Sequence, residues 1–310
     1  MIKNYAEMVK MIPDAGNKKT MVVVAAHDEH TLEAVHLAFI NGIADPILIG
    51  DGHRIREIID LRGFQLEGAE IIEEKDDRKA ARLAVSMIRG GAADFLMKGR
   101  IQTADLLKEV VNKDCGLQNS GVMSHIGFFE LPNYHKLLAL TDGGMIPHPN
   151  LEEKAQIIIN AVRTLHELGY NNPKVAVLAA AETVNPKIPE SVEAGLLKKM
   201  NEEGVIGGCM VEGPISYDLA MSPDAAKIKE YRSPVSGDVD VLIMPDMVSG
   251  NILAKAFQFS AGAKMAGVIV GAKAPIVLVS RGATAEEKYL STVLSAVLAQ
   301  TERKGRRDGS

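Results

Sequence analysis

Thr20-Met21-Val22-Val23-Val24-Ala25-Ala26 is the stretch of this sequence that decides the fold class. A run of apolar and β-branched residues without alternation is typical of a strand that is covered on both faces. The next segment, 29–41, places Leu32 and Val35 on one helical face and is closed by Gly42. We therefore expect a parallel sheet built from strand–helix units that begins here.

The same alternation continues along the chain and breaks once. Two apolar runs, 124–131 and 135–141, flank Pro132-Asn133-Tyr134 and are typical of an antiparallel hairpin. Further strands are predicted at 46–50, 69–73, 93–97, 174–180, 208–211, 239–244, 267–270 and 275–279. Helices are predicted between them, among them one that ends at Gly63 and others at 77–89, 103–112, 150–168, 190–201, 223–230, 251–261 and 285–299. Asn150 with Glu153 has the form of a capping box at the start of the helix 150–168. Strands separated by helices indicate parallel βαβ units.

Two such series indicate two α/β lobes with a ligand cleft between them. The Gly- and Pro-rich segment 141–150 is expected to connect them. We expect residues 1–143 with 274–310 to form one α/β domain and residues 144–273 to form the other. The sheets should be mainly parallel, with some antiparallel strands.

Composition narrows the class of protein. The chain has 310 residues, a net charge of −5 and 4% aromatic residues without Trp, which argues against a nucleic-acid partner. The first residues do not form a signal peptide and no uncharged apolar run is long enough to cross a bilayer, so we expect a cytoplasmic protein without a membrane partner. Cys115 and Cys209 are predicted to be reduced, structural thiols. No metal-ligand spacing, Walker A or GxGxxG motif occurs, so no metal site or bound cofactor is expected.

The segment 274–287 joins a predicted strand to a predicted helix through a polar turn. Ser280, Arg281 and Glu287 place a hydroxyl, a guanidinium and a carboxylate there. Ligands of α/β sheets bind at the carboxyl ends of strands, and helix N-termini attract anions. The alternative is structural, because Thr284-Ala285-Glu286-Glu287 has the form of a capping box.

Lys98-Gly99-Arg100 follows another predicted strand and precedes a helix for which Thr103 is a plausible N-cap. Gly99 permits close backbone approach, and two cations beside a helix N-terminus predict a second anion site. A solvated basic turn is the alternative.

Two further loops carry polar residues. After the predicted strand 239–244, Asp246 precedes Ser249 and Asn251, either of which could cap the next helix. Asp142 ends the predicted hairpin, where a buried carboxylate could bind backbone amides or orient a substrate.

Four loops together resemble the phosphate acetyl/butyryl transferase family, because their order and spacing match along nearly the whole chain. They are Met97-Lys98-Gly99, Thr141-Asp142-Gly143-Gly144 with Pro147-His148-Pro149-Asn150, Pro245-Asp246 with Ser249-Gly250-Asn251, and Ser280-Arg281-Gly282 running on to Glu287. Segments 175–182 and 266–278 are similar to the butyryl branch. The segment 142–147 departs from the Asp-Cys-Ala-Val-Asn-Pro usual in the acetyl branch.

The resemblance implies a two-lobed fold like that of isocitrate and isopropylmalate dehydrogenases, and a homo-oligomer. It implies that acyl-CoA and inorganic phosphate exchange reversibly with acyl phosphate and CoA in a ternary complex, with CoA as substrate rather than cofactor. Arg281 would hold the phosphate, Ser280 would hydrogen-bond the reacting carbonyl or thiol region, and Glu287 would take the thiol proton. Phosphate and CoA would contact Lys98, Gly99, Arg100, Thr103, Asp142, Pro147, Asp246, Ser249, Gly250 and Asn251.

Three alternatives stay open at this point. The substrate could be acetyl-CoA within the same family. A metal- and NAD-dependent hydroxy-acid dehydrogenase of the same fold would need a second carboxylate shortly after Asp246, and the sequence has none there. A non-catalytic protein that binds CoA or acyl phosphate is disfavoured, because Ser280, Arg281 and Glu287 are all present.

Overall fold

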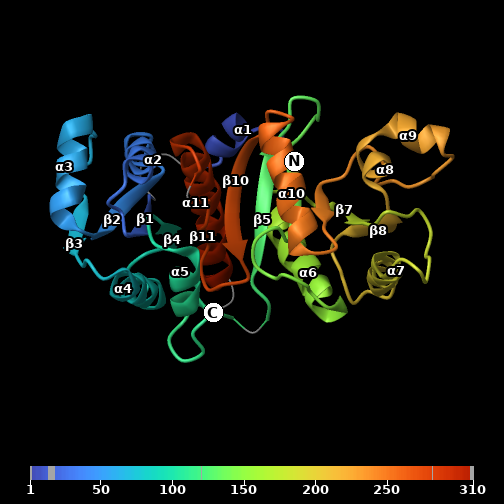
Figure 1. The fold of residues 1–310 in the computed structure, drawn as a ribbon, viewed down its shortest axis with the longest axis horizontal. Helices are drawn as coiled ribbons and strands as arrows, with labels where there is room; N and C mark the ends of the chain where they lie inside the picture. Colours follow the sequence, from blue (N-terminus) through green and yellow to red (C-terminus); the bar gives the residue numbers. More distant parts are fainter. Residues whose placement is uncertain (1, 13–17, 120, 281, 308–310) are drawn as a thin grey trace. The chain divides into compact units, whose positions relative to one another are not determined.

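The computed structural model describes residues 2–12, 18–119, 121–280 and 282–307, with side chains described up to residue 300. The chain forms two compact units (Figure 1). Unit 1 comprises Met1–Asn4 and Val122–Lys264, and unit 2 comprises Tyr5–Gly121 and Met265–Ser310. The domains expected from the sequence, 1–143 with 274–310 and 144–273, group the hairpin differently, and that assignment stays a prediction.

Unit 2 contains a sheet in which β1 lies between strands that follow it in the chain. The order is β3-β2-β1-β4-β11-β10. The strands are β1 (Lys19–Val24), β2 (Ala44–Gly50), β3 (Glu70–Glu73), β4 (Phe95–Lys98), β10 (Lys264–Val270) and β11 (Ile276–Val277). All neighbours pair in parallel except β10 with β11. The chain leaves β1 for β2 on one side and returns to β4 on the other, which makes the β1–β4 boundary a topological switch point.

The strand predicted from the opening stretch is confirmed. Residues 21–24 of β1 are completely buried, as an uninterrupted apolar run requires. Register places Val24 beside Lys98 and Met97 beside Val277, so the carboxyl ends of β1, β4 and β11 are neighbours.

The helices of unit 2 begin at polar caps. Asp28, Asp51 and Asp76 accept backbone N–H groups at the starts of α2 (Glu29–Ile40), α3 (Gly52–Arg62) and α4 (Asp77–Arg89). Gly63, in the left-handed conformation, ends α3 as its sequence predicts. The remaining helices are α1 (Tyr5–Val9), α5 (Thr103–Val110) and α11 (Ala285–Arg307). Helix α1 was not predicted from the sequence.

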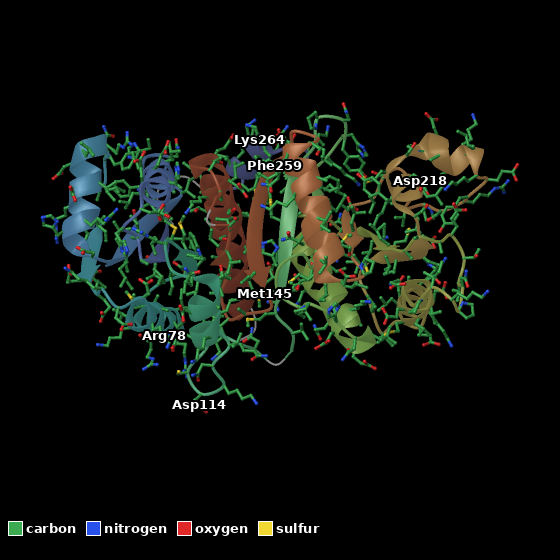
Figure 2. All side chains as sticks on the ribbon, in the orientation of Figure 1. Arg78, Asp114, Met145, Asp218, Phe259 and Lys264 are labelled. Atoms are coloured by element: carbon green, nitrogen blue, oxygen red, sulfur yellow. The ribbon has the colours of Figure 1, made fainter. Side chains whose placement is uncertain are left out.

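Unit 1 contains the predicted hairpin, β5 (Ser124–Glu130) with β6 (Leu138–Thr141), which is confirmed as antiparallel. The sheet continues through the parallel strands β9 (Val241–Ile243), β7 (Lys174–Leu178) and β8 (Met210–Ile215). Its helices are α6 (Leu151–Glu167), α7 (Pro189–Glu202), α8 (Tyr217–Met221), α9 (Pro223–Ile228) and α10 (Met247–Phe259). The capping box expected from Asn150 and Glu153 is present at the start of α6. Phe259, 82% exposed, ends α10 (Figure 2).

Two predicted helix caps are wrong. Gln102, not Thr103, is the N-cap of α5, and it makes no side-chain capping bond, so Thr103 is the first helical residue. Helix α10 begins at Met247 rather than at 251, because Asp246 caps it; Ser249 and Asn251 lie inside the helix. In the part of the chain that is described, no helix combines the length and apolarity needed to span a membrane.

Candidate functional site

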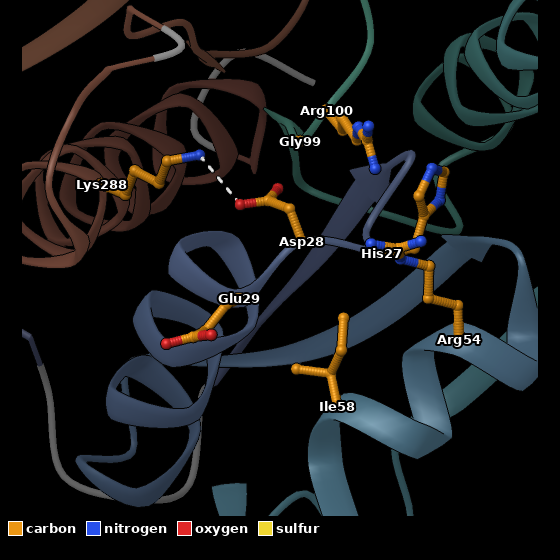
Figure 3. Close-up of a pocket in the computed structure, with 8 residues that line it drawn as sticks. All are labelled: His27, Asp28, Glu29, Arg54, Ile58, Gly99, Arg100 and Lys288. Atoms are coloured by element: carbon orange, nitrogen blue, oxygen red, sulfur yellow. Dashed lines mark ion pairs between the residues drawn. The ribbon is translucent and has the colours of Figure 1, made fainter. Parts of the chain in front are cut away.

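Unit 2 contains a cavity of about 350 Å³ at the carboxyl ends of β1 and β4 (Figure 3). The loop after β1, the loop after β4 and the first turns of α2, α3 and α11 all contribute to its wall. The lining residues are His27, Asp28, Glu29, Arg54, Ile58, Gly99, Arg100 and Lys288. Of the residues predicted from the sequence, Gly99 and Arg100 line it.

Gly99 allows the end of β4 to approach β1. A Cβ atom at this position would lie 2.4 Å from the carbonyl oxygen of Ala25 and 2.5 Å from that of Val24. The amides of Gly99 and Arg100 donate to those same two carbonyls at 2.9 Å. Because these N–H groups are used in strand pairing, the side chain of Arg100 is what this turn offers to an anion.

Lys98 stabilises the same turn from within. Its side chain is buried, and its ammonium donates to the carbonyl oxygen of Gly99 at 3.1 Å. Neither Lys98 nor Thr103 is among the residues that line the cavity.

Lys288 places a buried ammonium at the cavity wall, 4% exposed as a residue. Its Nζ donates to Thr31 Oγ1 at 2.8 Å and lies 3.9 Å from Asp28 Oδ1, the ion pair drawn in Figure 3. Burial lowers the pKa of Lys288, and the negative charges of Asp28 and Glu287 oppose that shift. Asp28 is also the cap of α2, since its Oδ1 accepts the amide of Thr31 at 3.0 Å.

Four residues of the cavity wall, His27, Asp28, Arg54 and Lys288, were not predicted from the sequence as members of a site. His27 and Asp28 follow the central strand directly, so the rule that ligands bind at carboxyl ends of strands could have found them. Lys288 offered no such signal, because its contact with Thr31 joins residues 257 positions apart.

The turn that carries Ser280 lies beside this cavity in the sheet, after β11. Ser280 is exposed; its Oγ accepts the amide of Gly282 at 3.4 Å, and its carbonyl accepts that of Ala283 at 3.0 Å. Arg281 lies outside the described residues. Glu287 is half-buried in the first turn of α11, and Thr284 Oγ1 accepts its amide at 3.2 Å. That bond is one half of the predicted capping box.

The predicted residues of unit 1 are brought together around Asp142, which is 3% exposed. Its carboxylate accepts the amides of Gly144 at 2.8 Å, Met145 at 2.9 Å and Ile146 at 3.2 Å. The expectation that Asp142 binds backbone amides is therefore confirmed. Burial raises the pKa of Asp142, while these amides and the nearby His125 oppose that shift.

The start of α10 packs against the same loop. A Cβ on Gly250 would lie 2.6 Å from the carbonyl oxygen of Asp142, so only glycine fits there. Asn251 Nδ2 donates to the carbonyl oxygen of Gly143 at 3.2 Å. The amide of Met247 donates to the carbonyl oxygen of Pro147, also at 3.2 Å. The amide of Ser249 donates to Asp246 Oδ1 at 2.8 Å.

Solved structures with a similar fold include a phosphotransacylase and a dehydrogenase. A branched-chain phosphotransacylase from Enterococcus faecalis superposes with a TM-score of 0.82 at 32% identity, covering 91% of this chain and 99% of that one. A 4-hydroxythreonine-4-phosphate dehydrogenase from Klebsiella pneumoniae reaches a TM-score of 0.55 at 15% identity and shares the fold alone. The dehydrogenase alternative is therefore not favoured.

Comparison of sequences agrees. A phosphate butyryltransferase from Clostridium acetobutylicum is 40% identical over 299 residues, 96% of this chain and 99% of the relative. A phosphate acetyltransferase from Thermotoga maritima is 42% identical over 284 residues, 92% and 96% of the two chains. A family model described as phosphate acetyl/butaryl transferase matches residues 4–84 and 77–296. The chain belongs to the phosphate acetyl/butyryl transferase family.

Proposed function

We propose that this protein transfers a short-chain acyl group, preferentially butyryl, reversibly between CoA and inorganic phosphate. The observation that carries the proposal is the match to a phosphate butyryltransferase at 40% identity over 96% of the chain. A preference for acetyl-CoA is the alternative, favoured by a phosphate acetyltransferase of similar identity.

The chemistry needs few groups. In one direction a phosphate oxygen attacks the thioester carbonyl carbon, the C–S bond breaks and the thiolate of CoA takes up a proton. In the other direction the thiol loses its proton, its sulfur attacks the acyl phosphate and phosphate leaves. Both directions pass through an anionic tetrahedral arrangement, so donors and cations aimed at that charge are the largest expected contribution.

We assign the three central roles to the turn between β11 and α11. Arg281 holds the phosphate and the developing negative charge, because a guanidinium matches phosphate geometry. The hydroxyl of Ser280, exposed at the end of β11, hydrogen-bonds the reacting carbonyl or thiol. Glu287 is the base for the thiol proton. A carboxylate and a thiol differ by about four pKa units, so positioning and electrostatics must supply most of the rate.

The start of α11 supports a role for Glu287 beyond capping. Its amide donates to Thr284 Oγ1, which is the half of a capping box that does not involve the carboxylate. The cation of Lys288 follows it in the chain, and the two charges interact. A nearby cation also stabilises the thiolate that the base produces.

We propose substrate-binding roles for the other predicted residues of both units. Arg100 is the phosphate-facing side chain of the β4 turn, while Lys98, Gly99 and Thr103 shape that turn. In unit 1 the amide cluster around Asp142 fixes the loop from Gly143 to Pro147 against Asp246, Ser249, Gly250 and Asn251, which would contact CoA or the acyl group.

The deciding experiment is a thiol-release assay with butyryl-CoA and phosphate, extended from acetyl-CoA to hexanoyl-CoA. We expect CoA release that depends on phosphate, with kcat/KM highest for butyryl-CoA. One methylene changes the discrimination between two substrates by only about 1–3 kcal/mol, so the kcat/KM values of neighbouring acyl-CoA substrates should differ by about 10–200-fold at most. Release that does not depend on phosphate for any acyl-CoA would contradict the proposal, and a maximum at acetyl-CoA would support the alternative.

We also propose a cytoplasmic homo-oligomer. Cys115 and Cys209 are free thiols, as expected in a reducing compartment, and burial raises the pKa of Cys209 to about 11. Val248, Ile252 and Phe259 form an exposed apolar row on α10, of 54%, 64% and 82% exposure, which a second copy of the chain would cover.

A further inference from the structure

The loop that follows β6 in unit 1 is held by its own buried carboxylate. Asp142 is 3% exposed. Its carboxylate accepts the amides of Gly144, Met145 and Ile146 at 2.8, 2.9 and 3.2 Å. Three successive N–H groups are therefore engaged inside the loop and are not aimed at a ligand. What this loop presents to a substrate is its side chains.

Packing restricts the backbone of the same loop at both of its glycines. A Cβ on Gly143 would lie 3.3 Å from the carbonyl carbon of Gly250, at the start of α10. A Cβ on Gly144 would lie 3.2 Å from the imidazole ring of His125. Thr141 Oγ1 donates to the carbonyl oxygen of His125 at 2.9 Å, which holds β5 against the end of β6. A backbone held in this way keeps the side chains that follow it in fixed positions.

Two apolar side chains follow on this backbone, those of Met145 (labelled in Figure 2) and Ile146. Both are half-buried, so part of each side chain is open to a ligand. Their loop begins where β6 ends, and β6 pairs in parallel with β9, so it lies at the carboxyl ends of the two strands. That is the edge at which α/β sheets bind ligands. Apolar side chains at this edge match an apolar part of a ligand.

In an acyl-CoA the apolar part next to the reacting carbonyl is the acyl chain. A hydrocarbon chain has no donor or acceptor, so a protein selects its length only through apolar contact area and the volume of the space that receives it. The unbranched side chain of Met145 adapts to an irregular gap. The β-branched side chain of Ile146 has few rotamers and forms a stiffer wall. The pair suits a short, flexible chain.

We propose that Met145 and Ile146 contact the acyl chain of the substrate and limit its length. The inference rests on the proposed function for the identity of the ligand, and it adds the residues that select among chain lengths. Because Asp142 and the two glycines hold the backbone, a shortened side chain leaves space that the loop does not refill. A longer acyl chain then occupies that space.

The test compares kcat/KM for butyryl-CoA and hexanoyl-CoA in Met145→Ala and in wild type. We expect the ratio of hexanoyl-CoA to butyryl-CoA to rise about tenfold, the lower end of what one methylene contributes in an apolar pocket. Ile146→Ala should move the ratio in the same direction. Met145→Leu conserves the volume and should keep the wild-type ratio. Met200→Ala is the matched control, because Met200 is a half-buried methionine of α7, outside this loop.

A purely structural role would lower kcat/KM for all acyl-CoAs alike, and that result, or a ratio equal to that of Met200→Ala, would overturn the assignment. Calorimetric Kd values for the unreactive thioethers S-butyl-CoA and S-hexyl-CoA give a second readout that needs no turnover. If no acyl transfer is found, yet Met145→Ala shifts binding from S-butyl-CoA toward S-hexyl-CoA, the proposed reaction fails while the chain contact stands. If the wild type neither transfers an acyl group nor binds S-butyl-CoA, both fail.

Discussion

At the scale of single residues, substitutions of Glu287 distinguish a catalytic role of its carboxylate from a helix-capping role. Glu287→Gln keeps the shape and the capping oxygen but removes the base, so kcat for acyl-phosphate consumption should fall about 10²-fold while stability changes little. The exposed neighbour Glu286→Gln is the control. If Glu287→Gln leaves kcat intact, the catalytic assignment is wrong. Glu287→Ala, which removes the capping oxygen, should lower the free energy of unfolding only if the residue serves as a cap.

Gly99 gives a test of close packing rather than of chemistry. Gly99→Ala would place a methyl group 2.4 Å from the Ala25 carbonyl oxygen, so either β4 or β1 must move. We expect a loss of about 1–3 kcal/mol in the free energy of urea unfolding, the usual cost of overpacking. Gly207→Ala, which has open space around its Cβ position, should change it far less. Equal losses in the two variants would show that strand contact does not restrict Gly99.

At the scale of elements, a partly buried charge cluster in unit 1 links the starts of three strands. Lys136, before β6, contacts Asp238 at 2.8 Å and Asp240 at 2.5 Å, both before β9. Lys174, the first residue of β7, contacts Asp238 at 2.5 Å. Burial alone would raise the pKa of Asp238, but bonds from Lys136, Lys174 and His135 outweigh it and the pKa lies well below the ordinary value.

This cluster predicts how stability depends on pH. A carboxyl whose pKa is lower in the folded state stabilises the fold above its unfolded pKa of about 3.9, and that contribution is lost as pH falls through the folded pKa. The free energy of urea unfolding of the wild type should therefore fall steeply below about pH 4. Asp238→Asn should be less stable at pH 7 and should lose less on acidification. A variant with the same pH slope as wild type would contradict this role.

The elements also show how far the sequence leads. Apolar runs and single caps predicted the β5–β6 hairpin, the capping box at Asn150 and the end of α3, because each signal is local. Helix α10 began earlier than predicted, since Asp246, Ser249 and Asn251 are all capping residues. Asp246 is the residue that caps α10, and in this position of the helix Gly250 packs against Asp142, more than one hundred residues away in the chain. The residues His27 and Lys288 line one cavity because β1, β4 and β11 are neighbours in the sheet.

At the scale of the whole molecule, the apolar row on α10 predicts assembly. Val248, Ile252 and Phe259 recur at helical spacing on one face, and Lys255 lies 5.7 Å from the ring centre of Phe259. A two-fold contact between identical helices would bury this face in both copies at once.

Ile252→Asp and Phe259→Asp should both convert the assembly to monomers, because each would place a carboxylate in the buried contact. Light scattering coupled to size-exclusion chromatography measures the change. Ile228→Asp on α9 is the control, since Ile228 is 83% exposed but lies outside the row and should leave the mass unchanged.

A monomeric wild type would contradict the oligomer itself. A wild-type oligomer that survives both α10 variants would place its contact elsewhere on the chain. Retained acyl transfer in a monomeric variant would further show that the active site is complete within one chain.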